Sequence, residues 1–191
     1  MAGGLGRRMD GADKALVALA GTPLIAHVLA RLRPQVRAVA INANGDPTRF
    51  AAYGVPVLPD PVPDFPGPLA GLLAGLIWAA AAGFEAVAVV AVDTPFFPAD
   101  MVVQLQSGIG TADVAMAQSG GRLHPTCALW RVGVLPVLTA ALAGGQRRVA
   151  QFAGAQALVR VPFAPATPDP FFNINDAGDL ALAETLIRGV A

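Results

Sequence analysis

The sequence predicts an α/β protein in which an open, mostly parallel sheet is flanked by helices. Short β-branched runs alternate with longer helical segments along the whole chain, the pattern of parallel strands joined by crossover helices. The 191 residues are 54% hydrophobic, which suits one domain with a sizeable core, so we expect 1–191 to be a single domain. Polar residues follow several of the expected strands directly, where open parallel sheets bind ligands.

The sequence pattern predicts the individual helices and strands. Thr22-Pro23 is an N-cap residue followed by proline at the first helical position, and opens a helix that Pro34 ends near residue 32. Residues 86–92 are consecutively apolar, as in a central parallel strand covered on both faces. The charge-free segment 67–84 is rich in Ala and Gly, which favours a helix packed on the sheet over a membrane span. The other expected strands are 37–43, 55–58, 114–117, 126–130 and 158–161, and the expected helices are 68–82, 98–105, 132–142 and 176–187.

Charge and cysteine content exclude several classes of protein. Thirteen basic residues balance thirteen acidic ones, so overall charge does not point to nucleic acid or to an anionic membrane as a partner. The single cysteine, Cys127, excludes an internal disulfide and a multi-cysteine zinc site, and we expect it to be a buried spectator. The first residues do not read as a secretory signal, so a cytoplasmic location is expected.

Residues 2–14 form a glycine-rich, doubly basic loop of the kind that surrounds nucleotide phosphates. Glycines let backbone amides approach a base or phosphate closely, while Arg7, Arg8 and Lys14 would neutralise a triphosphate. The loop lacks the third glycine of the dinucleotide fingerprint and the Lys-Ser/Thr of a P-loop, which disfavours ordinary dehydrogenases and kinases. The alternative is a flexible tail with solvated arginines.

Polar residues also end three of the expected strands. Asn42 and Asn44 end the first, Asp60 the second and Asp93 the third. Each alone has a structural explanation, as a turn former, a loop acid or a helix cap. Because all three strand ends share one rim with the glycine-rich loop, a common nucleotide site is the favoured interpretation.

Together these residues resemble the molybdenum cofactor guanylyltransferases, enzymes similar in fold to sugar-1-phosphate nucleotidyltransferases. The shared segments follow the family's order over nearly the whole chain, and this collinearity is more specific than any one motif. They are Ala2-Gly3-Gly4 through Arg8-Met9, Asp13-Lys14, Gly21-x-Pro23-Leu24, Asn42-Ala43-Asn44, Pro66-Gly67-Pro68-Leu69-Ala70-Gly71, Asp93-Thr94-Pro95-Phe96, His124-Pro125 and Phe172-Asn173-Ile174-Asn175. The resemblance implies a Rossmann-like three-layer α/β/α nucleotidyltransferase fold.

The resemblance also implies a reaction, the transfer of GMP from GTP to the terminal phosphate of molybdenum-bound molybdopterin with release of pyrophosphate. It assigns Mg²⁺ binding to Asp93 and charge neutralisation to Lys14 and Arg8. In this family an Ala-Gly-Gly loop goes with guanine and an Ala-Ala-Gly loop with cytosine, so Gly3 points to GTP. The implied nucleotide contacts are Ala2, Gly3, Gly4, Lys14, Asn42, Asp60 and Asp93.

For the second substrate, the resemblance places the pterin in the C-terminal half and the nucleotide in the N-terminal half. The arginines among the candidates have an alternative as solvated surface charges, His124 as a hydrogen-bonding turn residue, and the asparagines as caps of the last helix. Molybdopterin-inserting enzymes, chaperones and apo-molybdoenzymes are implied partners of a protein expected to be monomeric. The candidate pterin residues are Arg122, His124, Arg147, Arg148, Asn173 and Asn175.

Two positions depart from the family pattern. The family's loop follows an apolar strand in the middle of the sheet, and Met1 stands where that strand ends, so the first strand is expected to be missing from this chain. Asp10 replaces a glycine, and its carboxylate would weaken phosphate binding or approach the metal.

Two alternative functions remain open at this point. One is a related transferase that uses CTP or a sugar phosphate. The other is a module that binds the cofactor and hands it on without catalysis. Lys14 and Asp93 argue against the second alternative, whereas the missing strand would favour it.

Overall fold

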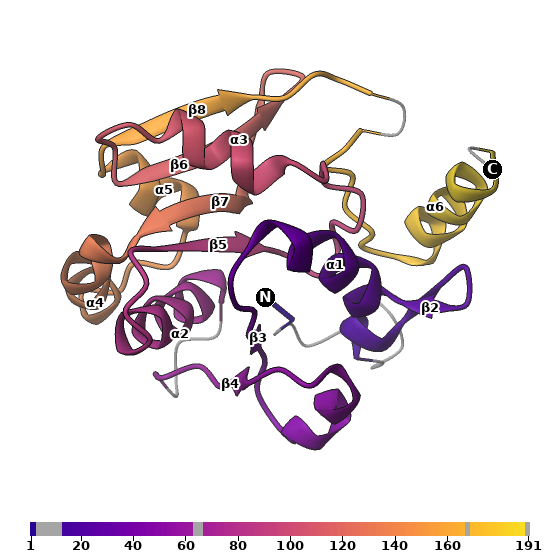
Figure 1. Ribbon diagram of the computed structural model, residues 1–191, viewed down its shortest axis with the longest axis horizontal. Coiled ribbons are helices and arrows are strands. Elements are labelled where there is room, and N and C mark those ends of the chain that lie inside the picture. The colour runs from indigo at the N-terminus through magenta and orange to yellow at the C-terminus, as the bar shows by residue number, and fades with distance from the viewer. Residues whose placement is uncertain (3–12, 63–66, 167–168, 190–191) are drawn as a thin grey trace.

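The computed structural model describes residues 1–2, 13–62, 67–166 and 169–189. Its central sheet has four strands in the order β5 (Ala86–Val90), β7 (Arg122–Arg131), β6 (Val114–Ser119) and β8 (Leu158–Pro162). β5, β6 and β8 point the same way, and β7 runs antiparallel between β5 and β6 (Figure 1). The sheet is therefore mixed: β6–β8 is a parallel pairing, and β7 pairs antiparallel with both β5 and β6. The strand predicted at 86–92 forms over Ala86–Val90. It is not the central, fully buried parallel strand expected, because it lies at the edge of the four-stranded sheet, its partner β7 is antiparallel, and its first three residues are half-buried.

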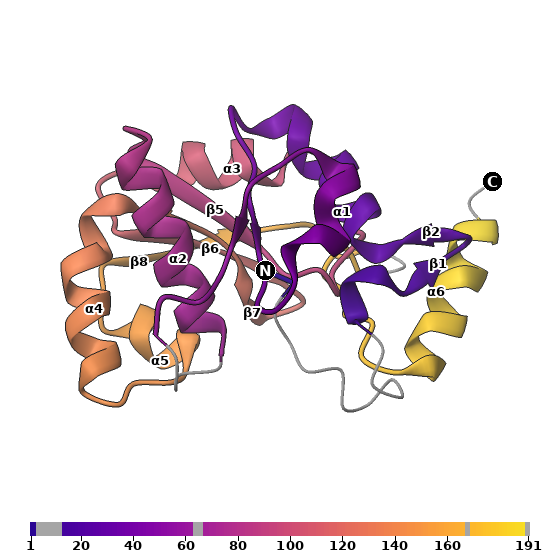
Figure 2. The same cartoon turned by 90° about the horizontal axis from the view of Figure 1, so that it is seen from below.

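Helices cover both faces of this sheet, which confirms the three-layer α/β/α fold. On one face lie α2 (Pro68–Ala81), α4 (Leu135–Ala143) and α5 (Val149–Gly154), and on the other lie α1 (Leu24–Leu32) and α3 (Met101–Gly108) (Figures 1 and 2). Alternation along β6 divides the two cores: Val114 and Met116 enter the first, and Ala115 and Ala117 enter the second.

The charge-free helix α2 packs on the sheet as predicted. Leu69, Leu72, Leu73 and Leu76 are buried in the first core, so its apolar residues are explained by packing. Within the described ranges, no helix has both the length and the apolar character needed to cross a membrane.

A smaller unit lies beside the sheet and contains the N-terminal elements. β3 (Ile41–Asn42) and β4 (Val57–Leu58) pair in parallel, and β1 (Ala18–Leu19) and β2 (Thr22–Pro23) form a hairpin. The C-terminal helix α6 (Ala177–Gly189) packs next to this hairpin (Figure 2). Short 3₁₀ helices complete the chain: η1 (Lys14–Leu16), η2 (Arg33–Gln35), η3 (Pro47–Tyr53) and η4 (Val132–Val134).

Several boundaries differ from the predictions. Thr22 does not cap α1, because Ala20 (φ 51°) and Gly21 (φ 80°) reverse the chain and place Thr22 and Pro23 in β2, so that the helix begins at Leu24. The strand predicted at 37–43 is only Ile41–Asn42, the part that pairs with β4. The predicted helix 98–105 lies at Met101–Gly108. The elements α5 (Val149–Gly154) and η3 were not predicted, because they are too short to show a helical spacing of apolar residues.

A gap separates β3 from β5, and among the residues that the structure describes Met1 and Ala2 bridge it. The Met1 amine donates to the Val90 carbonyl oxygen at 2.7 Å, and the Val92 amide donates to the Met1 oxygen at 3.0 Å. On the other side, the Ala2 amide donates to the Asn42 oxygen at 2.8 Å. Residues 1–2 thus occupy the end of a strand position between β3 and β5.

Beside this bridge lies a cavity of about 580 Å³, lined by residues 35–42, the length of β5, and Gly75 and Trp78 of α2. The described residues place no further strand in it.

Candidate active site

Asn42, Asn44 and Asp60 meet where β3 and β4 end. The Asn42 side-chain amide donates to Asp60 Oδ1 at 2.9 Å and to the Leu58 oxygen at 3.1 Å, and Asn44 donates to Asp60 Oδ2 at 2.7 Å. Asn44 Oδ1 in turn accepts the Asp60 backbone amide at 2.8 Å. The carboxylate is oriented by two amide donors and retains lone pairs for hydroxyl or N–H donors of a ligand.

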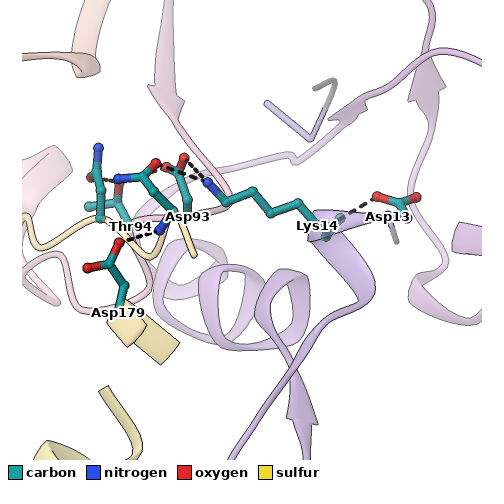
Figure 3. Close-up of polar contacts among 8 residues, drawn as sticks. Asp13, Lys14, Asp93, Thr94 and Asp179 are labelled. Atoms are coloured by element: carbon teal, nitrogen blue, oxygen red, sulfur yellow. Dashed lines mark hydrogen bonds and ion pairs between the residues drawn. The ribbon is translucent and has the colours of Figure 1, made fainter. Parts of the chain in front are cut away.

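Asp93 is the centre of a second polar cluster, beyond the end of β5. Lys14 Nζ lies 2.8 Å from Asp93 Oδ2 and 3.2 Å from Asn175 Oδ1 (Figure 3). The Thr94 hydroxyl lies 3.3 Å from Asp93 Oδ1 and donates to Asn173 Oδ1 at 2.8 Å. The Lys14 and Asp93 side chains are 19% and 21% exposed, so both charged groups remain accessible to a ligand.

Local structure explains why Lys14 points at Asp93. The Asp13 side chain accepts the Ala15 amide at 3.1 Å and so caps η1, which starts at Lys14. Asp13 and Lys14 therefore point in different directions, and Figure 3 shows the lysine chain extending toward the carboxylate. The predicted convergence of strand ends is confirmed: Met1–Ala2 lies directly between Asn42 on one side and the end of β5 on the other.

Arg49 links the Asn44 backbone to Asp13, the residue before Lys14, and the sequence analysis did not identify it. Its Nε lies 3.0 Å from Asp13 Oδ2, and a terminal nitrogen donates to the Asn44 oxygen at 2.7 Å. The guanidinium also sits 4.8 Å from the centre of the Phe50 ring. No motif marks this arginine, since its partners are brought to it only by the fold of η3.

Asn173 and Asn175 take part in the Asp93 cluster. The predicted alternative, in which they cap the last helix, is not what the structure shows. Asp176 accepts the Asp179 amide at 2.9 Å and Asp179 accepts the Asn175 amide at 2.8 Å, so aspartates supply the side-chain caps of α6. The asparagine side chains are then available to Thr94 and Lys14.

The remaining predicted pterin residues lie elsewhere on the molecule. His124 accepts or donates at 2.8 Å to the Ser119 hydroxyl, and Arg122 is exposed at the start of β7. Arg147 and Arg148 are exposed in the turn between α4 and α5, where Gln146 Oε1 accepts both of their backbone amides. Of the loop, Ala2 is 5% exposed, while Gly3, Gly4, Arg8 and Asp10 lie outside the described residues.

Cys127 is a spectator, as predicted. Its side chain is fully buried, and burial, reinforced by the charge of Asp93, raises the pKa of its thiol to about 12. A thiol with such a pKa carries essentially no thiolate at neutral pH, which excludes a nucleophilic role.

The donors around Asp93 suit Mg²⁺ better than a metal that needs several protein ligands. The described residues contain no group of three or more His, Cys, Asp and Glu side chains able to hold a metal. Mg²⁺ is commonly held by one or two carboxylates, with waters and substrate phosphates completing its shell. The partly exposed Asp93, with the Thr94 hydroxyl beside it, fits this requirement.

A three-layer α/β/α fold, a lysine–aspartate pair and an Asn–Asp network at the strand ends are what is expected of a nucleotidyltransferase. Comparison with known proteins makes this specific. Residues 1–160 match the MobA-like NTP transferase domain family. A molybdenum cofactor guanylyltransferase of Cereibacter sphaeroides is 50% identical over 190 residues, with 98% of this chain and 95% of that protein covered. One of Rhodobacter capsulatus is 54% identical over 189 residues, with 98% and 94% covered. The chain therefore belongs to the molybdenum cofactor guanylyltransferase family and is an enzyme of the nucleotidyltransferase class.

Solved structures support the fold. Molybdopterin-guanine dinucleotide biosynthesis protein A from Archaeoglobus fulgidus has a TM-score of 0.78 at 23% identity, with 98% of this chain and 96% of that chain covered. A 2-C-methyl-D-erythritol 4-phosphate cytidylyltransferase from Thermus thermophilus has a TM-score of 0.67 at 21% identity, with 94% and 96% covered. At these identities the likeness concerns architecture alone.

Proposed function

We propose that the protein transfers GMP from GTP to molybdenum-bound molybdopterin, releasing pyrophosphate and forming a guanine dinucleotide. The observation that carries the proposal is the Lys14–Asp93 pair, held with Asn175 at the same edge as the Asn42–Asp60 network. The proposal is supported by relatives named molybdenum cofactor guanylyltransferase, which are about half identical to the chain over nearly its full length.

The reaction is an in-line displacement at the α-phosphorus of GTP. An oxygen of the pterin phosphate forms the new P–O bond, the bond to the β-phosphate oxygen breaks, and pyrophosphate leaves with the electron pair. The nucleophile is already ionised, so no strong general base is needed. Positioning and neutralisation of phosphate charge therefore supply most of the rate enhancement.

The chain's own residues divide this work. Lys14 neutralises charge on the triphosphate and on departing pyrophosphate, from a position where its ammonium is already oriented by Asp93 and Asn175. Asn42 and Asp60 bind the guanosine, since Asp60 is oriented with free lone pairs. Arg8 and the backbone of Ala2, Gly3 and Gly4 complete the phosphate and base contacts, and Gly3 selects guanine.

Asp93 would hold Mg²⁺, with the Thr94 hydroxyl oxygen as a neighbour. When bound there, the ion would neutralise charge on the phosphate oxygens of the substrate. The Asp93 carboxylate orients Lys14 by their ion pair. The backbone carbonyl of Asp93 separately holds the 169–175 segment, because it accepts the Ile174 amide at 2.8 Å.

The pterin binds toward the C-terminal half in this proposal. Asn173 and Asn175 contact it beside Asp93, while Arg122, His124, Arg147 and Arg148 offer polar and cationic groups farther out. The proposal retains the expectation of a cytoplasmic, monomeric enzyme that passes its product, through inserting enzymes and chaperones, to apo-molybdoenzymes.

Pyrophosphate release in the presence of GTP, Mg²⁺ and molybdenum-bound molybdopterin tests the proposal. Asp93→Asn should lower turnover at least about 100-fold, because the neutral amide keeps the shape but loses the charge. Asp100→Asn is the matched control, since Asp100 is an exposed aspartate whose side chain contacts Gln104. Undiminished turnover in Asp93→Asn, with the fold intact, would contradict the role of this carboxylate.

Competition between GTP, CTP and UTP separates the proposal from a related transferase. GTP should displace a bound fluorescent guanine nucleotide, whereas CTP and UTP should not. Preferential binding of CTP would favour a cytidylyltransferase, the class represented among the structural neighbours. Tight GTP binding by the wild-type protein without turnover would favour a non-catalytic handover module.

A further inference from the structure

The 169–175 segment connects two parts of the molecule, and only one end of it belongs to the Asp93 cluster. At that end Asn173 contacts Thr94, the Ile174 amide donates to the Asp93 oxygen, and Asn175 contacts Lys14. Ile174 is fully buried, which fixes the backbone between the two asparagines. The position of both asparagine side chains therefore depends on how the whole segment is anchored.

The other end is anchored by a cluster on the β6–β7 hairpin. The Ser119 hydroxyl lies 2.8 Å from His124 Nε2 and 3.2 Å from Asp169 Oδ1. Asp169 Oδ1 also accepts the Phe171 amide at 2.8 Å, which makes a tight turn at the start of the segment. The His124 ring stacks on the Phe171 ring with centroids 4.5 Å apart.

The geometry excludes a nucleophilic serine here. Ser119 is 3% exposed, so a substrate carbonyl or phosphorus cannot reach its oxygen. Asp169 contacts the serine and not the imidazole, whereas in a nucleophilic triad the carboxylate orients the histidine. The cluster is built to hold Asp169 and Phe171 in place.

The protonation state of His124 agrees with this arrangement. Burial lowers the pKa of His124, with a further lowering by Arg122 and an opposing effect of Asp169, so the ring is neutral at neutral pH. A neutral ring with its proton on Nε2 donates to the Ser119 oxygen, and the Ser119 hydroxyl then donates to the Asp169 carboxylate. Each donor in this series of hydrogen bonds has one acceptor, and the series ends at the negatively charged Asp169 carboxylate.

We infer that the Ser119–His124–Asp169 cluster positions Asn173 and Asn175 at the reacting phosphates, and that His124 acts as a positioning residue through Phe171. The inference rests on the proposed function, because it assigns Asn173 and Asn175 a role in GMP transfer. The cluster itself does not touch the nucleotide. Its loss should reduce kcat and leave the affinity for GTP unchanged.

A double-mutant cycle between Ser119→Ala and a variant that carries both Asn173→Ala and Asn175→Ala tests the inference on the full chain. Ser119→Ala should lower kcat about tenfold, the variant without both asparagines should lose at least as much, and adding Ser119→Ala to that variant should slow it no further. Multiplied effects would overturn the inference, because they would mean that Ser119 does not act through the segment. Ser107→Ala is the matched control, since this serine on α3 only bonds back to the Val103 oxygen of its own helix.

Hydrogen exchange distinguishes failure of this inference from failure of the proposed function. The Ile174 and Phe171 amides should exchange faster in Ser119→Ala and in His124→Ala, whether or not GMP transfer occurs. Their exchange rates should not change in Ser107→Ala. Unchanged protection of both amides would overturn the anchoring role. If protection falls as expected but the wild type releases no pyrophosphate, the anchoring stands and the role in transfer fails.

Discussion

The sheet β5–β7–β6–β8 and the pair β3–β4 support the two sides of the same site in different ways. The four-stranded sheet is covered by helices on both faces and holds Asp93 and the 169–175 segment. The β3–β4 pair consists of two residues per strand and holds Asn42 and Asp60. In the described part of the chain, Met1 and Ala2 lie between the two, beside the cavity of about 580 Å³.

Because the two sides of the site are supported differently, we expect the residues that act in catalysis and those that bind the nucleoside to respond differently to mutation. Asp93 follows a strand of a continuous hydrogen-bonded ladder, and Lys14 reaches it from η1. The nucleoside side rests on one short ladder, the Arg49 contacts and the two-residue bridge. A strand position without a strand leaves neighbouring backbone edges without their ladder partners. We therefore expect changes near the gap to act on stability and GTP binding, and changes at Asp93 to act on turnover.

The largest effect is expected from supplying the strand. Extending the N-terminus by an apolar β-strand of about seven to ten residues would add ladder hydrogen bonds to β3 and β5 and fill the cavity with side chains. We expect a rise in the free energy of unfolding of roughly 3 kcal/mol or more, an increase in Tm of about 6–12 °C, and higher turnover. Thermal unfolding and pyrophosphate release measure these quantities.

A Gly/Ser extension of the same length is the control, because it cannot form the strand or fill the cavity. Equal Tm and equal turnover in the apolar-extended and unextended chains would contradict this account of the gap.

The next effect concerns pH and tests the same gap. In a chain that starts at Met1, burial lowers the pKa of its amine from 8.0 to about 6, with smaller opposing effects of Asp93 and Cys127. The unfolded chain then binds more protons, so stability is highest above pH 8 and falls as the pH drops through about 6. A difference of about two pKa units corresponds to roughly 2–3 kcal/mol.

Urea unfolding at several pH values measures this dependence. An N-terminally acetylated chain should lose the slope between pH 8 and pH 6, because the acetyl amide still donates a hydrogen bond but does not titrate. The same slope in both forms would show that another group is responsible.

The smallest expected effect is at Gly71, in α2 behind Asn42. A Cβ at this position would collide with Asn42 Oδ1 and lie 3.2 Å from Met1 Sδ, so Gly71→Ala must displace Asn42 from Asp60. Loss of such a hydrogen bond is worth about 1 kcal/mol, which predicts roughly fivefold weaker GTP binding with kcat little changed.

Gly75→Ala is the matched control for Gly71→Ala, one helical turn away. Its Cβ would meet Val87 Cγ1 at an ordinary 3.5 Å, so GTP binding should not change. Calorimetric titration of GTP into both variants makes the comparison, and equal affinities would refute the role of Asn42 packing.

Prediction from the sequence succeeded where periodicity or position along a strand decided the outcome. The strand that starts at Ala86, the helix that starts at Pro68 and the polar residues after β3, β4 and β5 all follow from the sequence pattern. Prediction failed where the neighbouring strand determines the outcome, as for the antiparallel direction of β7 and the shortness of β3. Arg49 was missed because Asp13 and Asn44, which it joins, are distant from one another in the sequence.

The sequence by itself determined the three-layer fold class, the polar residues at the strand ends and the family resemblance. The spacing of apolar residues and the order of motifs can be read along the chain without knowing which segments pair. Only the tertiary structure decided that Asn175 faces Lys14, that aspartates cap α6, and that Ser119, His124 and Asp169 hold the far end of the same segment. Hydrogen bonds of this kind depend on side chains from separate elements meeting within about 3 Å, which no spacing along the chain encodes.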